Sequence, residues 1–186
     1  MPIQNLKINQ NQGENKMKKL LIAIAFAAVA VAGANELLIK AAAIKEKGEW
    51  TVGGNILVPG GKFLFSKKKG AENTASGTYN MPEAGSYYVW VRTMNFGEKY
   101  RKTEVKFNEK SVGEFGDEGI KGDKKWGWKR SLAAIDLPAG EVKLELIPLS
   151  NVSRVADIIL TTDKDYTPVG KDREALEEID ELECCE

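Results

Sequence analysis

The chain has 186 residues, of which 42% are hydrophobic and 8% aromatic, so it suits one globular domain and not a disordered or fibrous chain. Its formal net charge is zero and it contains no histidine. Ser–His and Cys–His nucleophile pairs, imidazole bases and the commonest zinc ligand are therefore excluded. The only basic runs, Lys67–Lys69 and Lys121–Arg130, are too limited to predict a nucleic-acid-binding face.

Residues 17–34 contain the three parts of a signal peptide. Lys18 and Lys19 form a positively charged start, Leu20–Val31 is an uncharged apolar run of 12 residues, and Ala32–Ala34 is a small-x-small cleavage site. The run is short for a helix that crosses a bilayer, so a permanent membrane span is not expected. This segment predicts export.

The signal peptide also divides the beginning of the chain. Residues 1–16 are polar and carry no pattern, so we expect translation to start at Met17 and the mature chain to start at Asn35. No cysteine follows the apolar run, which excludes lipid attachment at the cleavage site. A secreted or periplasmic location is expected.

Short apolar runs alternate with turn signals from Glu49 onward, which is typical of an all-β sandwich or barrel. Residues 35–47 suit either a helix or an opening strand, 108–110 suit a hairpin turn, and a long polar loop is expected after 115. The predicted strands, in chain order, are residues 50–52, 56–58, 62–66, 75–81, 86–94, 103–107, 111–115, 132–137, 141–148 and 155–161.

The strand at 86–94 has the clearest alternation. Tyr88, Trp90 and Arg92 fall on one face, and the residues between them fall on the other. Because Trp90 lies in the middle of this strand among tyrosine and valine, the pattern favours core packing for its ring.

Residues 171–186 form an acidic tail with two basic and eight acidic residues. Apolar side chains recur at every third position between Leu176 and Leu182, which predicts a short helix that either docks or extends freely. Cys184 and Cys185 are adjacent and rarely bridge each other. They either belong to a frayed end or link two chains as a disulfide-bonded dimer in an oxidising compartment.

Several segments in a fixed order carry a family resemblance. They are MPEAGSYYVWVRT, VKFNEKSVGEFGDEG, the W-x-W pair at Trp126 and Trp128, LPAGEVKLELIPLS and RVADIILTTDKDYTP. Together they resemble the jelly-roll, galactose-binding-like carbohydrate-binding module appended to bacterial polysaccharide-degrading enzymes and some FAD-dependent oxidoreductases. The resemblance implies two antiparallel sheets, a structural calcium, recognition of a polysaccharide or oligosaccharide by loop aromatics, and an enzyme partner on a separate chain.

Trp126 and Trp128 are the leading candidates for sugar binding. Their W-x-W spacing in an extended chain points both indoles to one side, where flat aromatic faces can stack on pyranose rings. Alternatively, one or both rings cap an open end of the sandwich. Trp50 lies beside glycine-rich turns, and its ring is expected either to pack in the core or to contact the ligand.

Three cationic residues are candidates for binding an acidic glycan. Arg92 and Arg154 can bind carboxylates or sulfates through two parallel hydrogen bonds, although surface ion pairs are the commoner fate of arginine. The resemblance places Arg154 on the approach to the last strand, where a polar ligand contact is often found. Lys125 is the third candidate. Together with Lys124 and Lys129 it flanks the W-x-W pair, and these three lysines favour an acidic over a neutral glycan.

The densest loop cluster of acids is Asp117, Glu118 and Asp123, which offers three carboxylates to a calcium ion or to solvent. Its spacing does not match an EF-hand. Related modules begin with paired acids that help to bind calcium, whereas the corresponding stretch here, IKAAAIKEKGEW, carries alanines.

The sequence therefore predicts a polar extension (1–16), a signal peptide (17–34), a β-sandwich domain (35–170) and an acidic tail (171–186). The expected function is exported, non-catalytic carbohydrate binding. One alternative is a structural or adaptor sandwich that binds a protein. Another is a small polysaccharide lyase or glycosidase that uses tyrosine, arginine or paired carboxylates.

Overall fold

The computed structural model describes residues 35–55, 58, 61–94, 101–116 and 125–168. The extension at 1–16, the signal peptide, the acidic tail and most of the predicted 56–58 strand lie outside the described residues. Cys184 and Cys185 lie outside them too. In the described ranges, no helix is both long and apolar enough to cross a membrane.

The described chain is almost entirely β-structure, with two short 3₁₀ turns, η1 and η2. The elements are β1 (Glu36–Lys40), η1 (Ala41–Ala43), β2 (Trp50–Gly54), β3 (Lys62–Ser66), η2 (Ala71–Asn73), β4 (Ala75–Met81), β5 (Gly85–Met94), β6 (Thr103–Phe107), β7 (Lys110–Phe115), β8 (Trp126–Arg130), β9 (Ile135–Leu137), β10 (Gly140–Pro148) and β11 (Ser153–Thr161).

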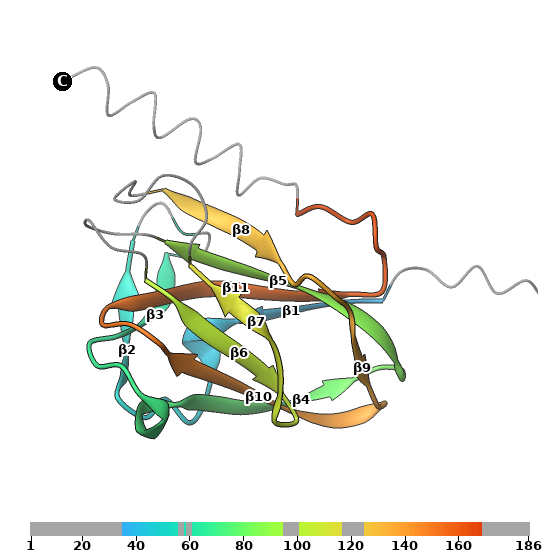
Figure 1. Cartoon of the computed structure of the whole chain (residues 1–186), viewed down its shortest axis with the longest axis horizontal. Coiled ribbons are helices and arrows are strands. Elements are labelled where there is room, and N and C mark those ends of the chain that lie inside the picture. Colours follow the sequence, from blue (N-terminus) through green and yellow to red (C-terminus); the bar gives the residue numbers. More distant parts are fainter. Residues whose placement is uncertain (1–34, 56–57, 59–60, 95–100, 117–124, 169–186) are drawn as a thin grey trace, which may run out of the picture. The chain divides into compact units, whose positions relative to one another are not determined.

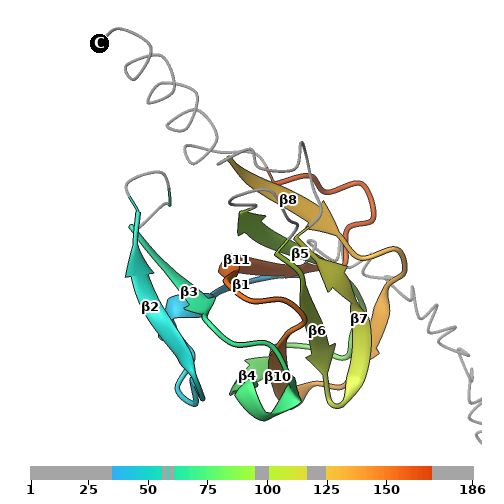
Figure 2. The same ribbon diagram turned by 60° about the vertical axis from the view of Figure 1, so that its left-hand side comes forward.

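The strands form two layers of a jelly-roll sandwich (Figures 1 and 2). The first sheet has the order β2-β3-β11-β5-β8, with β1 also paired to β11 and β9 also paired to β5. The second sheet has the order β4-β10-β6-β7. Every strand pairing among the described residues is antiparallel, as the family resemblance implied.

Alternation along the strands determines which side chains enter the core. On β5, Tyr87, Val89 and Val91 are at most 1% exposed and pack between the sheets. The inner face of the second sheet, which packs against these residues, contributes Val105 from β6 and Leu144 from β10, both fully buried. This confirms the predicted period of two and the all-β fold class.

Local turn chemistry also follows the sequence. Asn108 and Glu109 have φ values of 46° and 68°, the left-handed conformation that a tight hairpin requires at its two central residues. The turn connects β6 to β7 as predicted. Asn108 further accepts a hydrogen bond at Oδ1 from the backbone N–H of Lys143, which attaches the hairpin to β10.

Three elements differ from the sequence-based expectation or settle it. The strand predicted at 132–137 is confined to β9, because the chain bends at 132–133 and leaves Leu132 fully exposed. Residues 36–40 form strand β1, which settles the ambiguous opening segment. Residues 126–130 form strand β8 at the edge of the first sheet, although their polar composition predicted a loop. An edge strand accommodates such a sequence because one of its sides meets no neighbouring strand.

Candidate functional site

The outer face of the first sheet, the face turned away from the core, carries an unusual concentration of aromatic and cationic side chains. The antiparallel pairing of β5 with β8 places Arg92 opposite Trp128, and Trp90 opposite Arg130. Directly opposed residues project from the same side of a sheet. The pairing therefore gathers side chains that are far apart in the sequence, and it confirms that both indoles of the W-x-W pair point the same way.

A pocket of about 270 Å³ opens on this face. Its lining residues are Trp90, Arg92, Trp126, Gly127, Trp128, Thr167 and Pro168. Three indole rings and one guanidinium thus border a single hollow. The last two residues belong to the strap, the segment 162–168 that follows β11.

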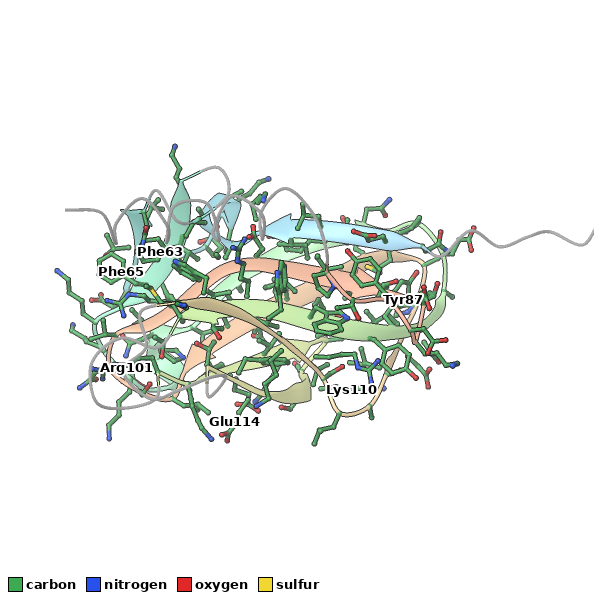
Figure 3. All side chains as sticks on the ribbon, turned by 90° about the horizontal axis from the view of Figure 1, so that it is seen from above. Phe63, Phe65, Tyr87, Arg101, Lys110 and Glu114 are labelled. Carbon is green, nitrogen blue, oxygen red and sulfur yellow. The ribbon has the colours of Figure 1, made fainter. Side chains whose placement is uncertain are left out.

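Trp126 forms the most rigid wall of the pocket. Its ring is 7% exposed and packs edge-on against Phe63, with 5.2 Å between the ring centroids. The ring centroid of Phe63 lies 5.9 Å from that of Phe65 on the same strand. Figure 3 labels both residues. Met94 and Val58 complete this small apolar cluster on the outer face. A ring supported in this way is held in place before any ligand arrives.

Arg92 lies at the floor of the pocket and is only 1% exposed. Its Nη1 atom lies 3.6 Å from Oδ2 of Asp157, a carboxylate that is itself 1% exposed. Lys40 brings its Nζ atom to 2.9 Å from Oδ1 of the same carboxylate. One buried anion therefore sits between two cations, and the guanidinium lies 5.8 Å from the ring of Trp128.

Two hydrogen bonds hold the strap against the first sheet, one from Arg130 and one from Tyr166. Arg130 places its guanidinium 5.0 Å from the ring of Tyr88 and 5.9 Å from that of Trp90, and it donates a hydrogen bond from Nη1 to the carbonyl oxygen of Lys164. Tyr166 donates from its hydroxyl to Glu36 at 3.1 Å. The strap thus forms one side of the pocket as a packed segment.

Arg154 lies on the same sheet but outside the pocket lining. Its position on β11 is directly opposite Phe65 on β3. Burial lowers the pKa of Arg154, and the positive charge of Arg101 lowers it further. Nearby, Val152 has a φ of 64°, which is rare for a β-branched residue and marks backbone strain beside this arginine.

The remaining sequence candidates have different positions. Lys125 is exposed and directly precedes β8, next to the pocket wall. Trp50 is 4% exposed in the core, where its indole nitrogen donates to the carbonyl of Asn73 at 2.7 Å. A ring enclosed in the core is not presented to a ligand.

Sequence reasoning missed Trp90 and the strap. Trp90 is half-buried on the outer face and lines the pocket, so the expectation of core packing is wrong. The signal was available, because the alternation of β5 already placed Trp90 on the face of Arg92. Thr167 and Pro168 carried no local signal; only the three-dimensional path of the chain brings them to the pocket.

The described residues on the first strand do not fit a calcium site. Glu36 accepts the hydroxyl of Tyr166, and Lys40 neutralises Asp157 at the other end of β1. In the part of the chain that the structure describes, no three Asp, Glu or Cys side chains gather closely enough to hold a metal. The loop acids Asp117, Glu118 and Asp123 lie outside the described residues.

A second, more open hollow of about 470 Å³ lies between the edge strand β7 and the segment that leads into β9. Val112 and Ile135 border it together with Leu132, whose side chain is fully exposed. This hollow contains no aromatic residue, in contrast to the pocket on the outer face.

No protein-family model matches the sequence, and no curated protein matches it. Solved structures do share its fold. The C-terminal family 6 carbohydrate-binding module of LamC, a laminarinase from Zobellia galactanivorans, is 17% identical, with a TM-score of 0.56 over 69% of this chain and 100% of that one. The chain therefore has the jelly-roll fold of carbohydrate-binding modules.

Two further structures share the same fold. A family 35 carbohydrate-binding module from Clostridium thermocellum has a TM-score of 0.57 at 15% identity, covering 68% of this chain and 98% of that one. A module of lichenase 5A from Cellvibrio mixtus, solved with cellotriose, has a TM-score of 0.55 at 15% identity, covering 68% and 97%. Other similar structures are larger enzymes in which the matched region is a minor part, such as a Phanerochaete chrysosporium exo-β-1,3-galactanase matched over 29% of its length.

Proposed function

We propose that this protein is an exported, non-catalytic carbohydrate-binding protein that holds an acidic polysaccharide on the outer face of its first sheet. The observation that carries the proposal is the pocket itself, in which three tryptophans and Arg92 border one hollow on a carbohydrate-binding fold. Sugar sites combine flat aromatic faces with a few fixed polar groups.

The aromatic residues suit a pyranose ring because its C–H groups pack favourably on an indole face. Trp128 is half-buried and thus retains surface for such a contact, whereas Trp126 is fixed by its packing against Phe63. Trp128 therefore supplies exposed ring surface for the ligand, and Trp126 supplies a wall of the pocket that does not move. A rigid wall lowers the entropy lost when a ligand binds.

The preference for an acidic glycan rests on the floor of the pocket. Arg92 and Lys40 flank the single carboxylate of Asp157, so two positive side chains meet one buried acid on this side of the sheet. A carboxylate or sulfate of the ligand would be attracted to these cations, and exclusion of water by the pocket walls strengthens such an attraction. A calcium ion has no assigned part in this recognition.

The non-catalytic assignment is supported by the chemistry that the chain lacks. Histidine is absent from the whole sequence, and the described acids do not form a pair at the pocket. Export follows from the signal peptide pattern at 17–34 and suits a protein whose ligand is extracellular.

Tryptophan fluorescence tests the proposal directly. Polygalacturonate and a neutral β-glucan are titrated into the purified protein, and we expect saturable quenching with the acidic polymer and at least tenfold weaker affinity for the neutral one, corresponding to roughly 1.4 kcal/mol. Trp128→Ala should abolish the response. Absence of saturable binding to any acidic or neutral glycan would overturn the proposed function.

Trp50→Phe is the matched control, since it removes a tryptophan from the core and leaves the pocket intact. It should change the total fluorescence and leave the affinity within about twofold. Release of reducing or unsaturated ends from either polymer would instead identify an enzyme and contradict the non-catalytic assignment.

One observation favours a second candidate function, the binding of a protein partner. Leu132 is fully exposed at the rim of the hollow beside β7, where an apolar side chain gains nothing from solvent. Leu132→Asp separates the two candidates. A glycan-binding protein should tolerate the change, because Leu132 does not line the tryptophan pocket.

A further inference from the structure

The wall of the tryptophan pocket is also the point at which the described chain ends. Thr167 and Pro168 line the pocket, and Pro168 is buried there. The strap that leads to them is fixed by Arg130 and Tyr166. Every residue after 168 therefore starts from a defined position at the pocket.

The segment that starts there has the opposite charge to the pocket. Residues 171–186 contain eight acidic and two basic side chains. Asp172 and Glu174 follow Pro168 by only four and six positions, so even a fully extended chain keeps their backbone within about 14 and 21 Å of it. Lys171 and Arg173 alternate with these two acids, so the excess of negative charge in the segment comes from residues 177–186.

Positive charge faces them from the floor of the pocket and from beside one of its walls. Arg92 lies at the floor, in an ion pair with Asp157 that Lys40 joins. The exposed Arg130 does not line the pocket, but its guanidinium lies 5.9 Å from the ring of Trp90, which does. Opposite charges held close by a short tether interact at a high effective concentration, on the order of millimolar. The described surface therefore complements the charge of the segment that leaves it.

We propose that the acidic segment 171–186 binds back onto the tryptophan pocket and competes there with anionic ligands. The docking itself goes beyond the proposed function, whereas the competition rests on it. Carboxylates of the segment approach the side of the pocket at which Arg92 and Arg130 lie. An acidic polymer must displace them, so the segment raises the apparent Kd of the polymer.

Charge neutralisation in the full-length chain tests the docking without any glycan. The variant carries Asp172→Asn, Glu174→Gln and Glu178→Gln. The control variant loses the same number of negative charges elsewhere, on the second sheet and its hairpin. Its changes are Glu109→Gln, Glu141→Gln and Glu145→Gln. The readout is the indole N–H resonances of the four tryptophans.

The resonances of Trp90, Trp126 and Trp128 should shift in the tail variant, and that of Trp50 should not, because Trp50 lies in the core. About 0.5 M salt should shift the unmodified protein toward the spectrum of the tail variant, since screening weakens exposed charge pairs. Unchanged pocket resonances in the tail variant, or the same shifts in the control, would overturn the docking.

Affinity for polygalacturonate then tests the competition. The tail variant should bind about twofold to fivefold more tightly than the unmodified protein, as expected when a competitor at millimolar effective concentration is removed. Equal affinity would overturn the competition. If neither protein binds any glycan, the proposed function fails, and the docking is still decided by the indole resonances.

Discussion

The two faces of strand β5 are built from alternate residues of one segment, yet they serve different ends. The inner face, with Tyr87, Val89 and Val91, meets the second sheet and is sealed by apolar packing. The outer face, with Trp90 and Arg92, is covered by side chains, an ion pair and the strap. Residues on the two faces of β5 are therefore buried in different ways. Those on the inner face are buried by apolar packing that stabilises the fold, and those on the outer face are buried by polar and aromatic contacts around the candidate site.

The largest effect is expected where the outer face depends on charge. Asp157→Ala leaves Arg92 buried without this carboxylate, and breaking a buried ion pair in this way costs about 3 to 5 kcal/mol. Urea denaturation measures the loss. Lys40→Ala is the control, because its half-exposed ammonium should contribute under about 1 kcal/mol. Equal losses of stability in the two variants would contradict the claim that the ion pair between Arg92 and Asp157 stabilises the outer face.

A core substitution on the neighbouring strand should cost nearly as much and leave the pocket unaffected. Leu160 on β11 is fully buried in the core, and Leu160→Ala should lower stability by about 3 kcal/mol through lost contacts and a cavity. The folded fraction should retain its glycan affinity. A change in affinity larger than in stability would show that the two faces are coupled.

Close packing on the outer face gives a smaller effect. A Cβ atom added to Gly53 would lie 2.5 Å from Cζ of Phe63, the ring that supports Trp126. Gly53→Ala should therefore cost about 1 to 3 kcal/mol and weaken glycan binding by displacing the pocket wall. Gly61→Ala, which meets no atom within 4 Å but has a positive φ, separates backbone strain from this contact. Normal binding by Gly53→Ala would exclude a supporting role for Phe63.

The smallest effect concerns pH and the inner face. Burial raises the pKa of Tyr87, and the charge of Glu83 raises it further. A raised pKa means that the folded state favours the neutral phenol, so this contribution is complete below the unfolded value of about 10 and declines as pH rises through the folded value. Tyr87→Phe should flatten that alkaline decline in thermal melts, and an unchanged slope would refute the assignment.

The fold followed from the sequence because its strands obey simple rules. Alternation, proline–glycine turns and the Asn108–Glu109 hairpin act over a few residues, and the strand from Lys62 to Ser66 was predicted to the residue. The strand from Trp126 to Arg130 escaped prediction because the edge of a sheet tolerates polar residues. The edge strand Ala75–Met81 was also predicted to the residue, so the prediction failed at Trp126–Arg130 because of the polar composition there and not because of its edge position alone.

The sequence predicted which types of residue form the candidate site, but it did not predict the full set of residues that line it. Trp126, Trp128 and Arg92 were named from residue type and spacing, and they do border one pocket. Arg154 and Trp50 were named by the same reasoning and lie elsewhere. The pairing of β5 with β8 determines which of these candidates lie at the pocket. This pairing depends on contacts between segments that are distant in the sequence, so a short stretch of sequence does not reveal it.

The last strand has a consequence for how the chain acquires its structure. β11 pairs with β1, β3 and β5, so residues as distant as Glu36 and Thr161 are direct partners. Contacts between such distant residues slow folding, because a long loop must close before they form. The first sheet is therefore complete only after β11 has been synthesised, because β11 is the strand that joins β1, β3 and β5.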